Sequence, residues 1–282
     1  MAYTTLIEPE QLAPHLGDAD WVVFDCRFDL GDPAKGRRDY VAGHIPGARY
    51  AHLDDDLAGP VVPGSGRHPL PEPQVFIGWL RRQGVSNISQ VVVYDDGPGA
   101  IAARLWWMLR HWLGHESTAL LHGGWAAWQA ADLACATDQP QPTPGDFAAS
   151  ANPAVVIDTR ALANALADEP PCLLDARMPP RFKGEIEPLD PVAGHIPGAV
   201  NLPFTVNLVE GRFANLENLR AHYLAALDGA APEDTVCMCG SGVTACHDLL
   251  AMELVGLPGG RLYVGSWSAW CSDPARPVAI GE

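Results

Sequence analysis

Short, nearly continuous apolar runs recur along the chain, and each is followed by a segment whose apolar residues have helical spacing. Runs of this length and composition are typical of strands that are buried on both faces of a parallel sheet. The clearest runs are WVVFDC at 21–26, QVVVYDD at 90–96, PCLLDAR at 171–177 and DTVCMC at 234–239. The pattern therefore predicts buried strands that are covered by helices.

Two segments, 100–113 and 243–257, predict helices that directly follow such strands. The second has one apolar face, formed by Val243, Cys246, Leu250, Leu254 and Leu257. Gly256 and Pro258 near its end are residues that commonly terminate helices. Because strand and helix alternate in both halves, we expect an α/β fold of mostly parallel sheets covered by helices.

Four landmarks occur twice, in the same order and at slowly drifting spacing. They are FDCR and LDAR at Asp25 and Asp175, AGHIPGA at Ala42 and Ala193, the strand ends at Asp95 and Cys239, and the tryptophans Trp125 and Trp267. The repeat is as long as a domain, so it indicates duplication rather than a solenoid. Residues shared by both halves, such as His44 and His195, are interpreted as structural.

The stretch ATDQPQPTPGDFAASANP between the two copies is rich in proline and polar residues and has no apolar periodicity. Such composition is typical of a linker. We therefore expect a first domain at 1–137, a linker at 138–153 and a second domain at 154–282.

The net charge of −16 excludes an extended basic surface, so we expect no nucleic-acid partner. No apolar run is long enough to span a membrane, and the first residues do not resemble a signal peptide, so a cytoplasmic location is expected. The seven cysteines are scattered without a CxxC pair, which predicts neither a disulfide framework nor a metal site. No cofactor is expected.

Cys239 differs from the other cysteines because it ends a strand and begins a glycine-rich turn, CGSGVT. Gly240 and Gly242 are expected to adopt backbone angles that other residues avoid, so that successive N–H groups converge on one point. The following helix adds partial positive charge there, which would stabilise a thiolate or a persulfide anion. The structural alternative is a small buried core residue, which is how we interpret Cys237 and Cys246.

With AGHIPGA written twice and CGSGVTAC after the second central strand, the chain resembles the two-domain rhodanese family of sulfurtransferases over nearly its whole length. CGSGVT is most similar to the loop of the 3-mercaptopyruvate branch. The resemblance implies two tandem rhodanese-like domains, of which the first is inactive because Asp95 occupies the nucleophile position. It also implies that Cys239 takes sulfur from a small anionic donor as a persulfide and passes it to cyanide or to a thiol, either a small thiol or a thioredoxin-like protein.

The same resemblance implies further site residues. Arg181 would bind the donor, and the loop residues Gly240, Gly242, Val243 and Thr244 would surround the transferred sulfur. Ser241, His68 and Asp54 would form a Ser-His-Asp set that handles a proton. The structural alternatives are a solvated arginine at 181, a loop histidine at 68 and a surface or helix-capping acid at 54.

One position departs from the 3-mercaptopyruvate branch, because Leu189 stands where a second donor-binding arginine is expected, and Lys183 is the nearest replacement in that segment. Thiosulfate is therefore the alternative donor. A phosphatase of related fold would need an arginine six residues after the cysteine, and this chain has Ala245 there. A non-enzymatic persulfide carrier or interaction module remains an alternative of another class.

Overall fold

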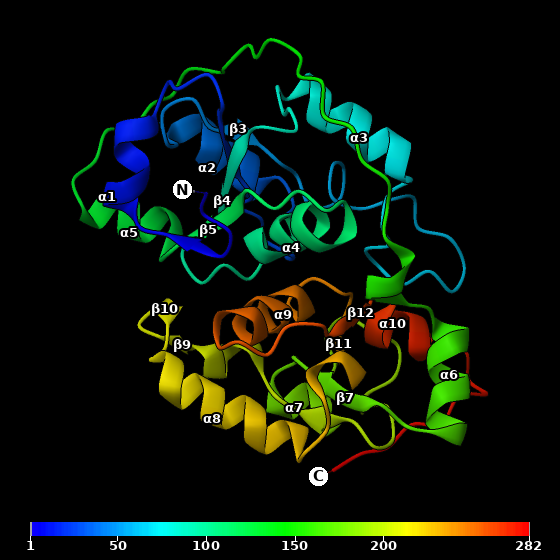
Figure 1. Cartoon of the computed structure of the whole chain (residues 1–282). Coiled ribbons are helices and arrows are strands. Elements are labelled where there is room, and N and C mark those ends of the chain that lie inside the picture. Colours follow the sequence, from blue (N-terminus) through cyan, green and yellow to red (C-terminus); the bar gives the residue numbers. More distant parts are fainter. Residues whose placement is uncertain (1, 282) are drawn as a thin grey trace. The chain divides into compact units, whose positions relative to one another are not determined.

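A computed structural model describes residues 2–281 (Figure 1). The internal contacts divide the chain into two units, each built around its own sheet. The first unit contains the residues up to Gly59, Pro71–Asn152 and Glu210–Arg212; the second contains Pro60–Leu70, Pro153–Val209 and the residues from Phe213 onward. One segment of the first half of the sequence, 60–70, thus belongs to the second unit.

Within the described chain, the first unit has a five-stranded sheet in the order β1-β5-β4-β2-β3, with every pair parallel. Its strands are β1 (Leu6–Ile7), β2 (Trp21–Asp25), β3 (Arg49–Tyr50), β4 (Gln90–Tyr94) and β5 (Thr118–Leu121). Its helices are α1 (Pro9–Leu12), α2 (Lys35–Ala42), α3 (Pro73–Arg82), α4 (Ala102–Trp107) and α5 (Gly124–Ala130). α4 continues into a π-helical turn over Met108–Trp112.

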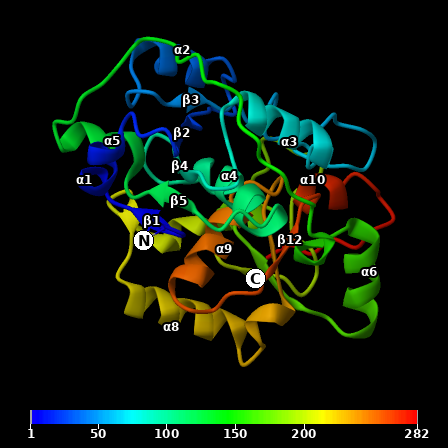
Figure 2. The same cartoon turned by 45° about the horizontal axis from the view of Figure 1, so that its top comes forward.

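The second unit repeats this plan, with the strand order β6-β12-β11-β7-β8 and only parallel pairs within that sheet. Figure 1 labels β7, β11 and β12 of this sheet, and Figure 2 labels β1 to β5 of the first sheet. The strands of its sheet are β6 (Val156–Ile157), β7 (Cys172–Asp175), β8 (Val200–Asn201), β11 (Thr235–Met238) and β12 (Arg261–Tyr263). A separate two-stranded sheet pairs β9 (Leu208–Val209) with β10 (Arg212–Phe213). Its helices are α6 (Thr159–Asp168), α7 (Pro179–Phe182), α8 (Leu216–Leu227), α9 (Ala245–Leu254) and α10 (Ser266–Trp270). The matching strand orders confirm the predicted duplication.

Helices cover both faces of each sheet because alternate strand residues point to opposite sides. In the first unit, Val92 and Tyr94 belong to a core cluster with Leu12 of α1 and Trp128 of α5, while α4 contacts β4 and β5. In the second unit, α6 and α10 pack on the face that carries Val236 and Met238, while α9 contacts β11 and β12. The predicted α/β fold class is confirmed.

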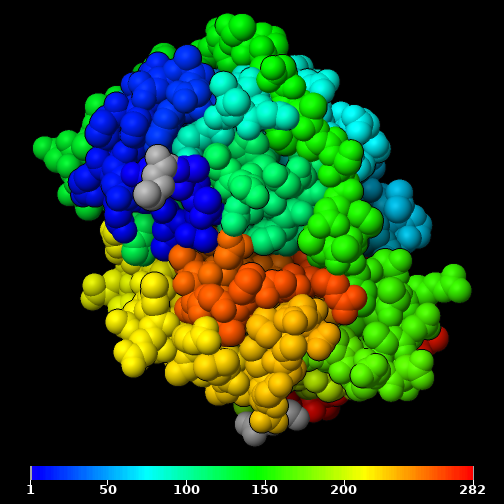
Figure 3. Space-filling model, viewed as in Figure 1, coloured from blue at the N-terminus to red at the C-terminus, as the bar shows by residue number. Residues whose placement is uncertain are grey.

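α9 departs from the predicted single apolar face. Every residue from Ala245 to Met252 is buried, and His247 and Asp248 have no exposed surface. Burial raises the pKa of Asp248 well above its usual value. The helix is thus mainly a core element. Its last two residues, Glu253 and Leu254, are partly exposed, as is part of the segment that follows, and this stretch of the chain is orange in Figure 3.

The histidines in the two copies of AGHIPGA make structural contacts, which agrees with the interpretation of His44 and His195 as structural residues. His44 stacks on Tyr40 and its Nδ1 lies 2.8 Å from the Tyr40 carbonyl oxygen, while His195 stacks on Phe182 with Nδ1 2.8 Å from the Phe182 carbonyl oxygen. Between residues 2 and 281, no helix is long and apolar enough to cross a membrane.

Candidate active site

Cys239 directly follows β11, the central strand of the second sheet. The chain leaves β7 toward β8 at one side and leaves β11 toward β12 at the other side. Ligands of open α/β sheets bind beyond the carboxyl ends of strands at such a change of direction. The register pairs Met238 with Asp175, so the loops after β7 and β11 start side by side.

The sulfur of Cys239 faces backbone N–H groups of its own loop. The Gly242 N–H donates to Sγ at 3.1 Å and the Ser241 N–H at 3.5 Å. The loop is held in place because the Cys239 N–H donates to Ser266 Oγ at 3.1 Å and the Trp267 N–H donates to the Cys239 carbonyl at 3.0 Å. This is an anion cradle of the predicted kind, with a sulfur at its centre.

The two glycines of the loop serve different purposes. Gly242 has φ of +76°, and a Cβ there would lie 2.6 Å from the Val264 carbonyl oxygen. Gly240 is not in the left-handed region, so the prediction of unusual backbone angles is confirmed for Gly242 and wrong for Gly240. A Cβ on Gly240 would instead lie 2.8 Å from Arg67 Nη2 and 3.3 Å from Arg181 Nη1. Gly240 leaves room for two guanidinium groups.

The remaining loop residues complete the turn into α9. Val243 is 5% exposed, and Thr244 is the last residue before the helix, without a side-chain capping bond. Cys246 Sγ donates to the Gly242 carbonyl at 3.4 Å, which fits its predicted structural role.

Ser241 and His68 are brought together although 173 residues separate them. Ser241 Oγ and His68 Nδ1 share a hydrogen bond of 2.7 Å, and both residues are almost completely buried. The contact lies inside the second unit because segment 60–70 belongs to it. The segment is anchored by the Arg67 N–H, which donates to Ser268 Oγ at 3.1 Å.

Asp54, the third residue of the predicted set, lies in the first unit. It is exposed and follows β3, and its N–H donates to His52 Nδ1 at 3.2 Å. Its part in the set stays a prediction.

Arg181 lies in α7 and is oriented by two carboxylates. Glu187 accepts from Arg181 Nε at 3.1 Å and from Nη2 at 2.7 Å, and Asp190 accepts from Nη2 at 3.2 Å. The side chains of Glu187 and Asp190 are each only 3% exposed. Leu189, by contrast, is 43% exposed. The predicted donor-binding arginine is therefore a fixed guanidinium beside the loop, not a solvated surface residue.

Sequence reasoning missed Arg67 and the carboxylates that hold the arginines. Arg67 Nη1 forms an ion pair with Asp190, so one carboxylate bridges Arg67 and Arg181. The signal for Arg67 is present in GRHPLP, where this basic residue directly precedes His68.

Two other buried cysteines, Cys237 of β11 and Cys26 of the first unit, have a different environment. Burial, followed by the negative charge of Asp248, raises the pKa of Cys237 well above its usual value. Burial and Asp25 raise the pKa of Cys26 in the same way. Such thiols stay protonated and inert. Of the cysteines in the described chain, none forms a disulfide.

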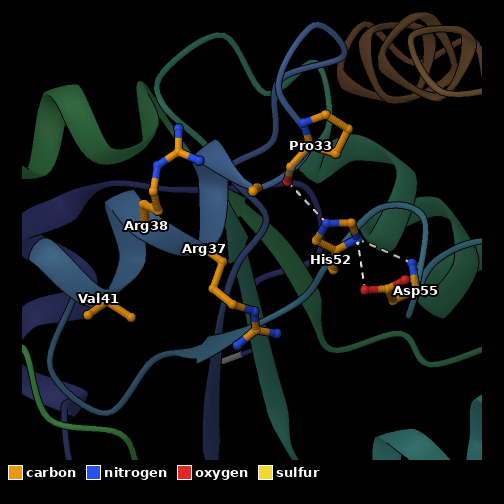
Figure 4. Close-up of a pocket in the computed structure, with 7 residues that line it drawn as sticks. Pro33, Arg37, Arg38, Val41, His52 and Asp55 are labelled. Atoms are coloured by element: carbon orange, nitrogen blue, oxygen red, sulfur yellow. Dashed lines mark hydrogen bonds and ion pairs between the residues drawn. The ribbon is translucent and has the colours of Figure 1, made fainter.

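A separate hollow in the first unit holds about 600 Å³ (Figure 4). Its histidine is used to fix the loop: His52 Nε2 lies 3.1 Å from the Pro33 carbonyl oxygen, and His52 Nδ1 accepts from the Asp55 N–H at 3.2 Å. The lining residues are Pro33, Ala34, Arg37, Arg38, Val41, His52 and Asp55. None of these side chains is a cysteine nucleophile, so we do not assign sulfur transfer to this hollow. Residues 2–281 bring together no group of three or more metal-ligating His, Cys, Asp or Glu side chains.

Comparisons with known proteins agree with this geometry. The rhodanese-like domain model matches twice, at residues 8–131 and 158–273. A protein of Pseudomonas aeruginosa with the provisional name 3-mercaptopyruvate sulfurtransferase is 50% identical over all of both chains. A protein of Mycobacterium tuberculosis with the provisional name thiosulfate sulfurtransferase is 38% identical over 98% of this chain and 97% of its own.

Among solved structures, the 3-mercaptopyruvate sulfurtransferase of Escherichia coli is 33% identical, with a TM-score of 0.83 over 94% of this chain and 100% of that one. The duplicated sheets, the cysteine loop and these matches agree over nearly the whole length. The chain belongs to the rhodanese family of sulfurtransferases.

Proposed function

We propose that this chain is a 3-mercaptopyruvate sulfurtransferase that carries sulfur as a persulfide on Cys239. The observation that carries the proposal is the buried hydrogen bond of 2.7 Å between Ser241 and His68. Ser241 lies two residues after Cys239 in the same loop. This pair is placed to deliver a proton, and only one of the two candidate donors needs a proton when its sulfur leaves.

In the first half-reaction, the Cys239 thiolate attacks the thiol sulfur of the donor. A new S–S bond forms, the donor's C–S bond breaks, and its electron pair stays on carbon as the enolate of pyruvate. The proton of the donor's thiol passes to the Ser241–His68 pair, Ser241 supplies a proton to the enolate, pyruvate leaves, and the outer sulfur remains on Cys239 as the persulfide anion. In the second half-reaction, a thiol or cyanide takes the outer sulfur and the Cys239 thiolate is regenerated.

The N–H groups that face the Cys239 sulfur support both halves of this cycle. They stabilise the attacking thiolate, and the loop amides beyond it can face the outer sulfur of the persulfide anion. Arg181, held by Glu187, is placed to bind the donor carboxylate with its planar guanidinium. Against a net charge of −16, such local cations are needed to hold an anionic donor.

Thiosulfate is the second candidate donor, favoured by Leu189, which leaves the segment after Arg181 without a second arginine. Its leaving group, sulfite, departs without a proton. The Ser241–His68 pair would then have no part in the transfer, which is why we rank thiosulfate second.

We further propose that the first domain, with Asp95 at the nucleophile position, is inactive, and that residues 154–282 carry the chemistry together with segment 60–70. The expected acceptor is a small thiol or a thioredoxin-like protein. Asp54 is proposed as the acidic partner of His68. A persulfide carrier without turnover is the alternative of another class, and a rate assay excludes or establishes it.

The test compares initial rates of the wild type and Ser241→Ala with 3-mercaptopyruvate and with thiosulfate, using cyanide as acceptor. We expect Ser241→Ala to lower kcat with 3-mercaptopyruvate by roughly 10²-fold and to leave kcat with thiosulfate nearly unchanged. An equal loss with both donors would contradict the proton role. A wild type that turns over neither donor would contradict the enzyme assignment.

A further inference from the structure

Two guanidinium groups, from Arg67 and Arg181, lie against Gly240 in the cysteine loop. A Cβ on Gly240 would lie 2.8 Å from Arg67 Nη2, and 3.3 and 3.4 Å from the two Nη atoms of Arg181. Arg181 comes from the segment after β7, as family resemblance implies. Arg67 comes from segment 60–70, more than a hundred residues away in the sequence.

Asp190 holds both groups in this position. Its Oδ1 is paired with Arg67 Nη1 and its Oδ2 with Arg181 Nη2, and its side chain is 3% exposed. A buried carboxylate with two guanidinium partners fixes their relative orientation. The pairing directs Arg67 Nη1 to Asp190, while Nη2 lies at Gly240, one residue from the nucleophile.

We propose that Arg67 is a second donor-binding residue, which supplies the cation that this chain lacks at Leu189 and contacts the carboxylate of the donor together with Arg181. The inference rests on the proposed function, and it assigns to segment 60–70 a role in donor affinity in addition to the histidine that it carries. Gly240 is part of the arrangement, because any side chain at this position would occupy the space of Arg67 Nη2.

Charge and exposure support a binding role over a purely structural one. The Arg67 side chain keeps 28% of its surface exposed while its partner Asp190 is buried, so the guanidinium remains accessible to a ligand. Its backbone is anchored separately through Ser268. The side chain is therefore not needed to hold segment 60–70 in place, and its removal is expected to spare His68.

The experiment measures KM and kcat with 3-mercaptopyruvate for the wild type, Arg67→Ala and Arg67→Lys, with Arg38→Ala as a matched control. Arg38 is an exposed arginine of α2 that also pairs with an aspartate, Asp32. We expect Arg67→Ala to raise KM roughly 10- to 100-fold, the range for losing a hydrogen bond to a charged group. The KM of Arg67→Lys is expected to lie between those of the wild type and Arg67→Ala, and the KM of Arg38→Ala should match the wild type. For every variant, kcat should change by less than about threefold.

Calorimetric titration with pyruvate, the product carboxylate, gives a second readout that does not depend on turnover. The affinity for pyruvate should fall by the same factor as KM rises. Unchanged KM and affinity in folded Arg67→Ala, or a loss confined to kcat, would overturn the role of Arg67 while leaving the proposed function in place. If the wild type turns over neither donor, the proposed function fails, and the titration still decides Arg67: weaker binding by the variant supports it, and equal or absent binding by both proteins refutes it.

Discussion

The two sheets share one frame of buried charges at corresponding positions. Arg27 donates to Asp25 with Nη2 at 2.6 Å and to the Gly43 carbonyl at 2.6 Å, and its guanidinium lies 4.9 Å above the Trp125 ring. In the second unit, Arg177 donates to Asp175 at 2.6 Å and to the Gly194 carbonyl at 2.8 Å, 4.7 Å above Trp267. Three of the four sequence landmarks that occur twice are the parts of this frame, and the fourth is the pair of strand ends at Asp95 and Cys239.

The loops that follow the central strands differ in what they hold. In the first unit the Asp95 carboxylate accepts four backbone N–H groups of its own loop at 2.9–3.1 Å, from Gly97, Gly99, Ile101 and Ala102. In the second unit the loop N–H groups face the sulfur of Cys239. The same kind of cradle therefore holds a carboxyl group in one loop and a cysteine sulfur in the other.

The two units thus differ in these loops rather than in the frame. The Asp95 carboxylate satisfies the amides of its own loop and so stabilises that turn. The first unit also has Gly31 four residues after its frame arginine, where the second unit has Arg181. Both units thus share the frame, while the loop N–H groups face a carboxylate in the first unit and a cysteine sulfur in the second, which agrees with the proposal that only the second unit carries the chemistry.

The largest effect is expected from removing the sulfur from the reactive loop. Cys239→Ser should lose sulfur transfer by on the order of 10⁴-fold or more, because a hydroxyl cannot form the persulfide, and the measured unfolding midpoint should stay within a few degrees of wild type. Cys135→Ser, at an exposed cysteine of the first unit, is the matched control and should keep full activity. Retained turnover in Cys239→Ser would refute the mechanism.

Much of this arrangement could be predicted from the sequence because it is local or repeated. The strand runs agree with β2, β4, β7 and β11 within one or two residues at each end, since buried parallel strands are continuously apolar. Cys239 stood out because a cysteine, a strand end and two glycines are adjacent in the chain. The duplicated motifs indicated the frame without showing its hydrogen bonds.

What the sequence did not predict depends on contacts between distant segments. No local pattern places segment 60–70 with the second unit. The pairing of Ser241 with His68 was therefore predicted only through the family resemblance, and the approach of Arg67 to Gly240 was not predicted. Gly240 was assigned to backbone freedom, whereas the structure assigns it to space for guanidinium groups. The prediction of a single apolar face for α9 was wrong, because burial on all sides depends on how the helix packs and not on the spacing of its apolar residues.

A smaller effect, on stability, is expected from changing the charge of Asp95 in the loop after β4. Asp95→Asn keeps one carbonyl oxygen for two of the four N–H donors, but its amide group would face the donors from Ile101 and Ala102. Leaving these buried donors unpaired should lower the free energy of unfolding by about 3 kcal/mol, measured by urea denaturation. Sulfur transfer at 25 °C should remain, since the reactive loop is unchanged. A stability loss below about 0.5 kcal/mol would mean that the carboxylate does not hold the first loop.

The smallest stability effect is expected from substitutions of the frame arginines Arg27 and Arg177. The two substitutions should lower the free energy of unfolding equally, but only one of them should change KM. Arg27→Lys and Arg177→Lys each lose the bidentate geometry toward a fully buried aspartate, and each should cost about 2 kcal/mol in urea denaturation. Arg177 Nη1 also lies 3.6 Å from Glu187, which orients Arg181. Arg177→Lys should therefore raise KM for the donor several-fold, while Arg27→Lys leaves KM unchanged. If both variants raised KM equally, the frame would transmit to the site from either unit, and the separation between a structural and a chemical half would fail.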